Sequence, residues 1–326
     1  MIRAWFLQPR FGLMPIFHPI SQQAHAISEL FAFVLVLSAV VFAGIVGALI
    51  YIMWRFRRGR DGSGAEPRPV FGHSRIEILW TAIPIGIVGV LFVLTLVAMR
   101  ASDPDAPADR APDITVVGHQ WWWEIRYPAA GVVTANDLHI PVGRKQLVEL
   151  QSADVIHDFW VPRLGRKLDM VPGRHARLWL AADSAGTYFG ACAEYCGNEH
   201  AWMQIRVTAE SPATFASWLA AQARPAPALG GPSDSGAALG AQLFSRLTCV
   251  NCHAVRGTSD TATVGPDLTH VASRPSLAAG RLVNTPENLR RWMAEPDLIK
   301  PGSYMPNLHL SDQDLDHIVA YLLTLR

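Results

Sequence analysis

The chain has 326 residues, of which 50% are hydrophobic and 17% are charged. This composition is too apolar and too poor in charge for a disordered protein, and a length above the roughly 100 to 200 residues of one domain excludes a single small module. The 28 basic and 27 acidic side chains nearly cancel, so no overall positive field favours nucleic-acid binding. Four cysteines in so long a chain are too few for a disulfide scaffold, and their grouping in close pairs indicates metal or cofactor chemistry.

Two uncharged, apolar runs near the start of the chain predict a transmembrane hairpin over residues 27–100. Residues 30–53 and 78–99 carry no charged side chain, and at about 1.5 Å per residue each run can cross the roughly 30 Å hydrocarbon core. Pro84 lies near the start of the second run, where neighbouring groups can satisfy the carbonyl that it frees. We therefore expect two membrane spans.

The segment between these runs is basic, which sets the expected orientation. Its charged residues are Arg55, Arg57, Arg58, Arg60, Asp61, Glu66, Arg68, Arg75 and Glu77. The excess of arginine places this loop in the cytoplasm by the positive-inside rule. Both termini and everything after Arg100 are then expected outside, in the periplasm of a bacterial inner membrane. Residues 1–26 are expected to form an N-terminal arm, and their Ala24-His25-Ala26 triplet faintly resembles a signal-peptide cleavage site, which leaves processing open.

The next part of the chain, residues 101–222, is predicted to be an all-β domain. Short apolar or alternating runs between turn signals favour an antiparallel sandwich or barrel. The predicted strands are Ile114–Val117, Trp121–Tyr127, Leu138–Ile140, Leu147–Leu150, Ala176–Leu180, Tyr188–Ala191 and Met203–Val207. Ser211-Pro212 then predicts the start of a short helix that closes the domain.

Residues 223–235 are dominated by Pro, Gly, Ala and Ser and are predicted to be a flexible linker. Residues 236–326 follow with a helical pattern. We expect helices over residues 237–247, after Thr285-Pro286 and after Ser311. A helical domain of this size has a limited core and usually needs an additional stabilising crosslink, which a covalent cofactor would supply.

The helical domain contains a haem-attachment pattern. Cys249 and Cys252 are followed by His253 in a C-x-x-C-H run, in which two thiols form thioethers and the histidine ligates iron. Met305 lies on a predicted loop before the last helix and is the candidate for the second axial ligand. His270 or His309 could take that place instead. A redox-active Cys-x-x-Cys pair is the competing interpretation, but it normally lies in a βαβ setting that this segment lacks.

Three segments of residues 236–326 resemble a class I cytochrome c. They are C-V-N-C-H at residues 249–253, Gly265-Pro266-Asp267-Leu268 and Tyr304-Met305-Pro306. The resemblance implies that the Gly-Pro-Asp-Leu segment borders haem c and that Pro266 packs near the proximal histidine.

A second cluster of soft ligands lies within residues 192–203. Cys192, Cys196, His200 and Met203 offer thiolate, imidazole and thioether donors, a set that selects copper over hard cations. A single blue copper needs one cysteine, so the second thiolate is surplus unless two coppers share both sulfurs. Such a pair needs a further imidazole, for which His157 is the candidate. Structural zinc, which would leave Met203 unused, and a disulfide are the alternatives.

Residues 27–222 resemble cytochrome c oxidase subunit II. The segments that carry the resemblance are Ile76–Thr81, Gly118–Trp123, Val155–His157, Asp169–Gly173 and the cysteine block. The resemblance implies a cupredoxin domain that holds a dinuclear CuA centre. The residues that match its ligands are His157, Cys192, Cys196, His200, Met203 and, through the main-chain carbonyl, Glu194.

The same resemblance implies roles for three further side chains. The Glu194 carboxylate would reach a magnesium ion at the contact with subunit I, Glu77 would lie at the mouth of a proton path, and electrons would enter the copper centre through Trp121. Each has a plainer alternative. Trp121 could be a core residue, Glu77 a marker of the membrane boundary and Glu194 a turn carboxylate.

Together the segments resemble the caa-type oxidases, in which a cytochrome c is attached to subunit II. The expected fold is a membrane-anchored multidomain chain with a two-helix transmembrane hairpin, an all-β cupredoxin-like Greek-key barrel and a small all-α cytochrome c domain. The expected function is that of a cytochrome c oxidase subunit that passes electrons through haem c and CuA to haem in subunit I, where oxygen is reduced to water with proton pumping.

The expected partners are subunit I, subunit III, membrane lipid and an electron donor, which is a soluble or membrane cytochrome c or a quinol–cytochrome c reductase. No nucleic-acid partner is expected. Two alternatives stay open. The chain could be the copper and haem c subunit of a nitric oxide reductase, or a stand-alone electron shuttle or copper carrier anchored in the membrane.

Overall fold

The computed structural model describes residues 14–57, 69, 71–102, 106–107, 109–229 and 235–326. By its internal contacts the chain divides into two compact units. One is His25–Asp103, and the other joins Met1–Ala24 with Pro104–Arg326. Most of the predicted cytoplasmic loop, including Arg58, Arg60 and Arg68, lies outside the described residues, as do residues 1–13 of the predicted N-terminal arm.

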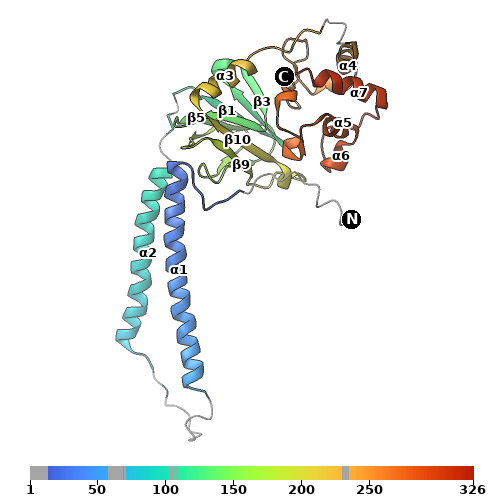
Figure 1. The fold of residues 1–326 in the computed structure, drawn as a ribbon. Helices are drawn as coiled ribbons and strands as arrows, with labels where there is room; N and C mark the ends of the chain where they lie inside the picture. Colours follow the sequence, from blue (N-terminus) through green and yellow to red (C-terminus); the bar gives the residue numbers. More distant parts are fainter. Residues whose placement is uncertain (1–13, 58–68, 70, 103–105, 108, 230–234) are drawn as a thin grey trace. The chain divides into compact units, whose positions relative to one another are not determined.

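The first unit is a helical hairpin (Figure 1). Helices α1 (Gln22–Arg55) and α2 (Ser74–Ser102) contain the two predicted spans and extend beyond them at both ends. In the most apolar 18-residue stretch of α1, 0% of the residues are buried, and in that of α2, 6% are buried. At about 1.5 Å per residue both helices exceed the roughly 30 Å hydrocarbon core. Long apolar helices whose side chains are left uncovered by protein fit a lipid environment.

The β-domain consists of two five-stranded sheets. The first has the order β3-β2-β1-β5-β8 and the second the order β4-β10-β9-β6-β7. The strands are β1 (Ile114–His119), β2 (Trp122–Tyr127), β3 (Val132–Ala135), β4 (Asp137–Pro141), β5 (Gln146–Ser152), β6 (His157–Trp160), β7 (Leu168–Met170), β8 (Ala176–Leu180), β9 (Gly186–Cys192) and β10 (Gln204–Glu210). Every strand that the sequence predicts is present, and β3, β6 and β7 are additional.

The sheets bury one apolar core between them. Trp123 of β2 is fully buried and meets Phe159 of β6 edge to face, with ring centroids 6.0 Å apart. The predicted sandwich is present and most of its strand pairs are antiparallel, but β1 pairs with β5 and β4 pairs with β10 in parallel. Parallel pairs need a crossover connection. Here the chain leaves the first sheet after β3, forms β4 in the second and returns to the first as β5.

The segment just before α1 is tied to the β-domain. The Ile20 amide donates to the Arg163 carbonyl over 2.8 Å, and the Ile20 carbonyl accepts from the Asp183 amide over 2.9 Å. Ser21 is buried and donates from Oγ to the Leu164 carbonyl. Because these bonds satisfy the backbone in both directions, the described end of the predicted arm has a fixed place in this unit.

The helical domain follows the helix α3 (Pro212–Gln222), which the Ser211 side chain caps as the sequence predicts. Its helices are α4 (Ser235–Arg246), α5 (Pro286–Ala294), α6 (Pro296–Ile299) and α7 (Asp312–Leu322). The side chains of Thr285 and Ser311 cap α5 and α7, which satisfies amides that a helix start leaves free.

Part of the predicted linker contacts this helical domain. The Ala226 amide donates to the Arg256 carbonyl over 2.8 Å, and the Arg224 carbonyl lies 3.0 Å from His270 Nε2. Leu229 packs against the helical core. Residues 230–234 lie outside the described residues, so the flexibility of the linker stays a prediction.

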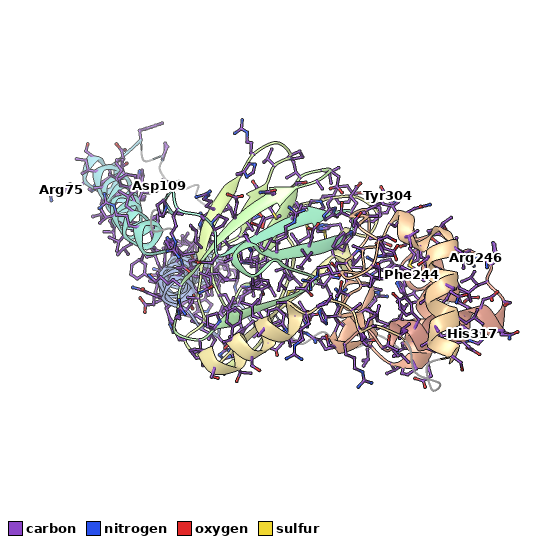
Figure 2. The ribbon with its side chains drawn as sticks, turned by 90° about the horizontal axis from the view of Figure 1, so that it is seen from above. Arg75, Asp109, Phe244, Arg246, Tyr304 and His317 are labelled. Atoms are coloured by element: carbon purple, nitrogen blue, oxygen red, sulfur yellow. The ribbon has the colours of Figure 1, made fainter. Side chains whose placement is uncertain are left out.

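Helix α4 crosses α7 at Gly240, which gives a first testable prediction. A Cβ atom at Gly240 would lie 1.9 Å from the His317 carbonyl oxygen, whereas one at Gly236 would meet His317 Nδ1 at 3.6 Å, an ordinary contact. Figure 2 labels Phe244 on α4 and His317 on α7. Gly240→Ala should therefore destabilise the helical domain by about 1–3 kcal/mol through overpacking.

Gly236→Ala on the same helix is the matched control. It should be neutral or slightly stabilising, because alanine favours helix more than glycine does. Thermal unfolding followed by circular dichroism measures both variants. Equal midpoints for the two variants would show that the crossing can open without cost.

Candidate functional site

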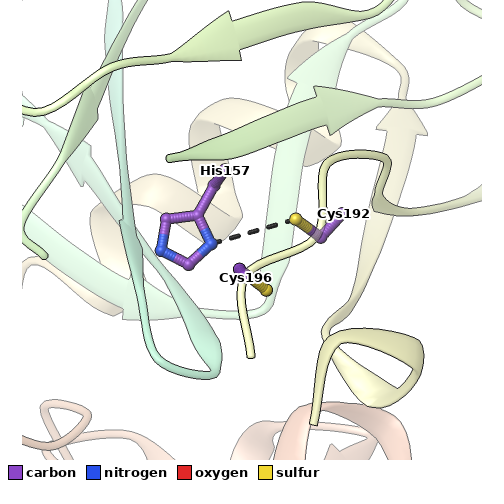
Figure 3. A group of neighbouring side chains, drawn as sticks. All are labelled: His157, Cys192 and Cys196. Atoms are coloured by element: carbon purple, nitrogen blue, oxygen red, sulfur yellow. Dashed lines mark hydrogen bonds between the residues drawn. The ribbon is translucent and has the colours of Figure 1, made fainter. Parts of the chain in front are cut away.

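Three potential metal ligands meet between β6 and the end of β9. His157 begins β6, Cys192 ends β9 and Cys196 follows in the next loop (Figure 3). One ligand atom from each lies within 4.8 Å of the others, and all three side chains are buried. His157 Nδ1 is 3.8 Å from Cys192 Sγ. Phe159 pairs with Cys192 across β6 and β9, so the sheet itself sets the spacing of imidazole and thiol.

The other predicted donors complete the cluster. His200 begins the short helix η3 (His200–Trp202), and its Nδ1 lies 3.6 Å from Cys196 Sγ. Met203 is fully buried with its sulfur 3.8 Å from Cys196 Sγ. The main-chain carbonyl of Glu194 lies 3.1 Å from Cys192 Sγ. The structure therefore brings together all six groups that the sequence nominated.

The imidazole of His157 is held by residues that the sequence analysis did not identify. Its Nε2 donates to Asp154 Oδ1 over 2.8 Å, which leaves the lone pair of Nδ1 facing the thiols. Asp154 is in turn fixed by the amides of Gln120 and Val155, each 2.7 Å away. On the other side, Gly118 lies so close that a Cβ would meet His157 Cδ2 at 2.7 Å.

The two thiols interact strongly. The hydrogen bond from Cys196 lowers the pKa of Cys192 to about 3, while the Cys192 thiolate and burial raise the pKa of Cys196. One negative charge is thus stable in the cluster and a second is opposed. Bound metal cations would favour the second thiolate as well, because metal ligation requires deprotonated cysteines. All four cysteines of the chain are free, and the soft donor set fits copper.

Gly118 supplies a second prediction. Gly118→Ala would push its new methyl group into the His157 ring, so the imidazole must move away from the thiols. We expect most of the bound copper to be lost, with overpacking of about 1–3 kcal/mol. Copper content and the copper electron-spin spectrum measure the effect, and haem content of the same preparation is the internal control. Full copper occupancy in the variant would contradict the tight fit.

Trp121 lies in the turn before β2 and contacts the cysteine loop directly. Its indole Nε1 donates to the Cys196 carbonyl over 2.9 Å, and the Gln120 amide side chain donates to the same oxygen over 2.8 Å. Trp121 is only 5% exposed and belongs to the β-domain core. Trp121 is therefore a core residue, as the plainer interpretation expects, and it also contacts the loop that carries the cysteines.

The C-x-x-C-H run folds into a second site. Cys249 lies in the short helix η5 (Thr248–Asn251), and Cys252 and His253 follow it. His253 Nδ1 donates to the Pro266 carbonyl over 2.8 Å, which leaves Nε2 free to ligate a metal. Burial lowers the pKa of His253, which favours the neutral imidazole that a metal needs. A Cβ at Gly265 would meet His253 Cε1 at 2.6 Å.

A cavity of about 560 Å³ opens beside this histidine, a volume typical of cofactor pockets. Its lining includes Cys249, Cys252, His253 and Met305. His270 and His309 are not among the described residues that line it, and His270 Nε2 instead faces the Arg224 carbonyl. The predominantly apolar walls and two thiols beside an imidazole fit a covalently attached haem.

The two predicted carboxylates occupy exposed positions. Glu194 is exposed beside the cysteine loop. Glu77 Oε1 accepts from the His73 amide over 3.0 Å at the start of α2, as an acidic group in a first helical turn does. No contact among the described residues tests the magnesium role of Glu194 or the proton-path role of Glu77.

Three family models match this chain. The family model described as cytochrome C oxidase subunit II, transmembrane domain, matches residues 14–100. The model described as cytochrome C oxidase subunit II, periplasmic domain, matches residues 129–210. Cytochrome c matches residues 237–326.

Curated relatives match over most of the chain. Cytochrome c oxidase subunit 2 of Alkalihalophilus pseudofirmus is 36% identical over 90% of this chain and 86% of the relative. This chain belongs to the cytochrome c oxidase subunit II family. Cytochrome c oxidase subunit 2 of Bacillus subtilis is 33% identical over 85% of this chain and 82% of the relative. The solved periplasmic domain of subunit II from Bradyrhizobium japonicum is 31% identical over 35% of this chain and 95% of that domain, with a TM-score of 0.33.

Membership in the subunit II family confirms several predictions. The chain is a subunit of the oxidase with a cupredoxin-like domain and a cytochrome c domain, which bind copper and haem c. A subunit II associates with subunit I of a haem-copper oxidase, and the matched transmembrane and periplasmic domains describe a membrane-anchored protein with periplasmic domains.

Proposed function

We propose that this chain is the subunit through which electrons enter its oxidase. When bound, haem c and a dinuclear CuA centre supply one-electron relay from an external donor to haem in subunit I, where oxygen is reduced to water with proton pumping. The observation that carries the proposal is the double contact of Trp121. This indole donates to the carbonyl of Cys196 and also lines the cavity of His253 and Met305.

The copper cluster would hold two metal ions through residues already brought together by the fold. Cys192 and Cys196 would hold the ions through their sulfurs, and the Nδ1 atoms of His157 and His200 face these sulfurs from separate segments. Met203 and the Glu194 carbonyl supply two further donors near opposite sulfurs. Soft sulfur and imidazole ligands are those that copper prefers.

The haem would be attached through Cys249 and Cys252, and His253 and Met305 would ligate its iron. Pro266 holds the His253 ring in the tautomer that presents Nε2 to the cavity. A methionine ligand raises the reduction potential of a haem, which suits a group that both accepts and donates electrons readily.

The side chains of Glu77 and Glu194 are assigned roles at the surface that contacts the partner subunit. We assign the Glu77 side chain to the mouth of a proton path and the exposed Glu194 side chain to a magnesium ion at the contact with subunit I. Glu77 lies at the start of a membrane helix and Glu194 beside the copper cluster, and a carboxylate suits a hard cation. Subunit III and membrane lipid complete the expected surroundings.

The chain would lie in a bacterial inner membrane with both termini and both redox domains on the periplasmic side. The basic residues Arg55, Arg57 and Arg75 near the cytoplasmic ends of the two helices support this orientation through the positive-inside rule. The donor would then be a periplasmic or membrane cytochrome c, or a quinol–cytochrome c reductase.

Purification of the complex that forms around the full chain tests the proposal. The expected result is a co-purifying haem-copper subunit, with oxygen consumption on addition of a reduced cytochrome c. Nitric oxide consumption without oxygen consumption would point to a nitric oxide reductase and contradict the proposal. A chain that purifies alone from its native membrane, with both metals bound, would indicate a stand-alone electron shuttle.

A further inference from the structure

A lysine of the cytochrome domain is buried against the β-domain. Lys300 is 5% exposed, although lysine is almost never fully buried without a partner. Its Nζ lies 2.7 Å from Glu199 Oε2 and donates to the Trp121 carbonyl over 3.0 Å. Glu199 itself is 1% exposed. The ammonium therefore bridges two segments of the β-domain that are far from Lys300 in sequence.

Both partners of Lys300 adjoin residues of the copper cluster. Glu199 directly precedes His200, and Trp121 donates to the Cys196 carbonyl. One cation thus joins the segment that carries the cysteine loop to the turn that carries Trp121.

The residues after Lys300 continue the same contact. The ring of Tyr304 lies 5.1 Å from that of Trp121, and the Tyr304 hydroxyl donates to Gln120 Oε1 over 3.1 Å. Figure 2 shows Tyr304 on the side of the cytochrome domain that faces the strands. Because Met305 follows Tyr304, the loop that would supply an iron ligand is held against the turn that supports the copper ligands.

A separate contact is made by an arginine. The Arg281 guanidinium carbon lies 4.7 Å from the Trp202 ring centroid, within range of a cation–π interaction. Trp202 directly precedes Met203. The cytochrome domain therefore touches the copper-ligand segment at both Glu199 and Trp202.

The burial of the Lys300–Glu199 ion pair determines how strongly it can favour one arrangement of the two domains. An exposed pair contributes little and allows many arrangements, whereas the loss of one partner from a buried pair leaves an uncompensated charge. A buried pair is therefore suited to specify one docked arrangement. Trp121, at 5% exposure, is covered in that arrangement and has little surface left for a separate donor protein.

We propose that Lys300 is a positioning residue that, through Glu199 and the Trp121 carbonyl, locks the cytochrome domain onto the β-domain face that bears Trp121 and closes that face to external donor proteins. This inference rests on the function proposed above and deepens it. The attached cytochrome domain is then the occupant of the donor surface, and external donors deliver electrons to its haem.

The first test is hydrogen exchange in the full chain assembled with its partner subunits. Lys300→Met and Glu199→Gln should each raise amide exchange in residues 120–122 and 300–305 by about tenfold or more, as the loss of one docking contact would. Lys300→Arg keeps the charge and should retain most of the protection. Arg290→Met is the matched control, because Arg290 pairs only with the exposed residues Asp312 and Asp316 of its own domain in the interactions described.

Electron transfer provides the second readout on the same complexes. After flash reduction of haem c, the rate of copper reduction should fall about tenfold or more in Lys300→Met and become dependent on viscosity, as for a tethered domain that must find its site. It should stay unchanged in Arg290→Met. The copper electron-spin spectrum checks that Glu199→Gln leaves the metal centre intact.

Exchange and transfer rates in Lys300→Met that equal those of Arg290→Met would overturn the inference. Failure of the proposed function has a different signature. In that case the unaltered chain itself would show no transfer from haem to copper, while the exchange pattern would still report whether Lys300 holds the two domains together.

Discussion

Replacement of His200 by alanine should abolish the copper spectrum of this chain and leave its haem spectrum intact. His200 Nδ1 is one of only two imidazole nitrogens that face the thiols in the described cluster, so one copper would lose its nitrogen ligand. The haem ligands belong to a separate segment that begins at Cys249. Outer-shell changes cost about 10- to 100-fold in metal affinity, and loss of a direct ligand should cost more.

His175→Ala is the matched control for this variant. His175 is an exposed histidine of the same domain whose Nδ1 lies 3.1 Å from Glu149 Oε1. Copper and iron contents, with optical and electron-spin spectra, measure both variants. Loss of both chromophores in a folded His200→Ala chain would contradict the independence of the two sites, and retention of the mixed-valence copper signal would remove His200 from the ligand set.

Replacement of Met305 by alanine should leave the haem covalently attached but lower its reduction potential. Thioether attachment depends on Cys249 and Cys252, which the substitution leaves in place, whereas a methionine ligand raises the potential. We expect a fall on the order of 100 mV, a fraction of the roughly 0.8 V that axial ligands span. A spectroelectrochemical titration of the full chain measures the shift.

His309→Ala and His270→Ala complete the Met305 experiment. Met305 lines the cavity beside His253, whereas His309 and His270 are not among its described lining residues. Both histidine variants should therefore keep the potential of the unaltered chain. An unchanged potential in Met305→Ala, together with a changed one in either histidine variant, would reassign the second axial ligand.

Much of the two sites could be predicted from the sequence because their ligands are local. Cys192, Cys196, His200 and Met203 lie within one loop and its flanks, and Cys249, Cys252 and His253 are contiguous. Ligand spacing of this kind carries its chemistry in the sequence itself. Strands could be predicted equally well where apolar and polar residues alternate. Residues 204–210 are an example, because their burial alternates strictly along β10.

The supporting residues could not be predicted, because each acts through a contact that only the fold creates. Asp154 fixes His157, and Gly118 leaves room for the same ring, yet an acidic turn residue and a strand glycine carry no signal of either role. Lys300 and Trp121 are 179 positions apart. The parallel pairs of β1 with β5 and of β4 with β10 likewise depend on crossovers between the sheets.

We infer that this one chain carries both a dinuclear copper centre and a covalent haem. The most direct measurement is the copper, zinc and iron content of the purified full-length chain after copper reconstitution, with its optical and electron-spin spectra. We expect two coppers and one iron per chain, with a mixed-valence copper signal that depends on both Cys192 and Cys196. One zinc, or iron with no copper, would contradict it.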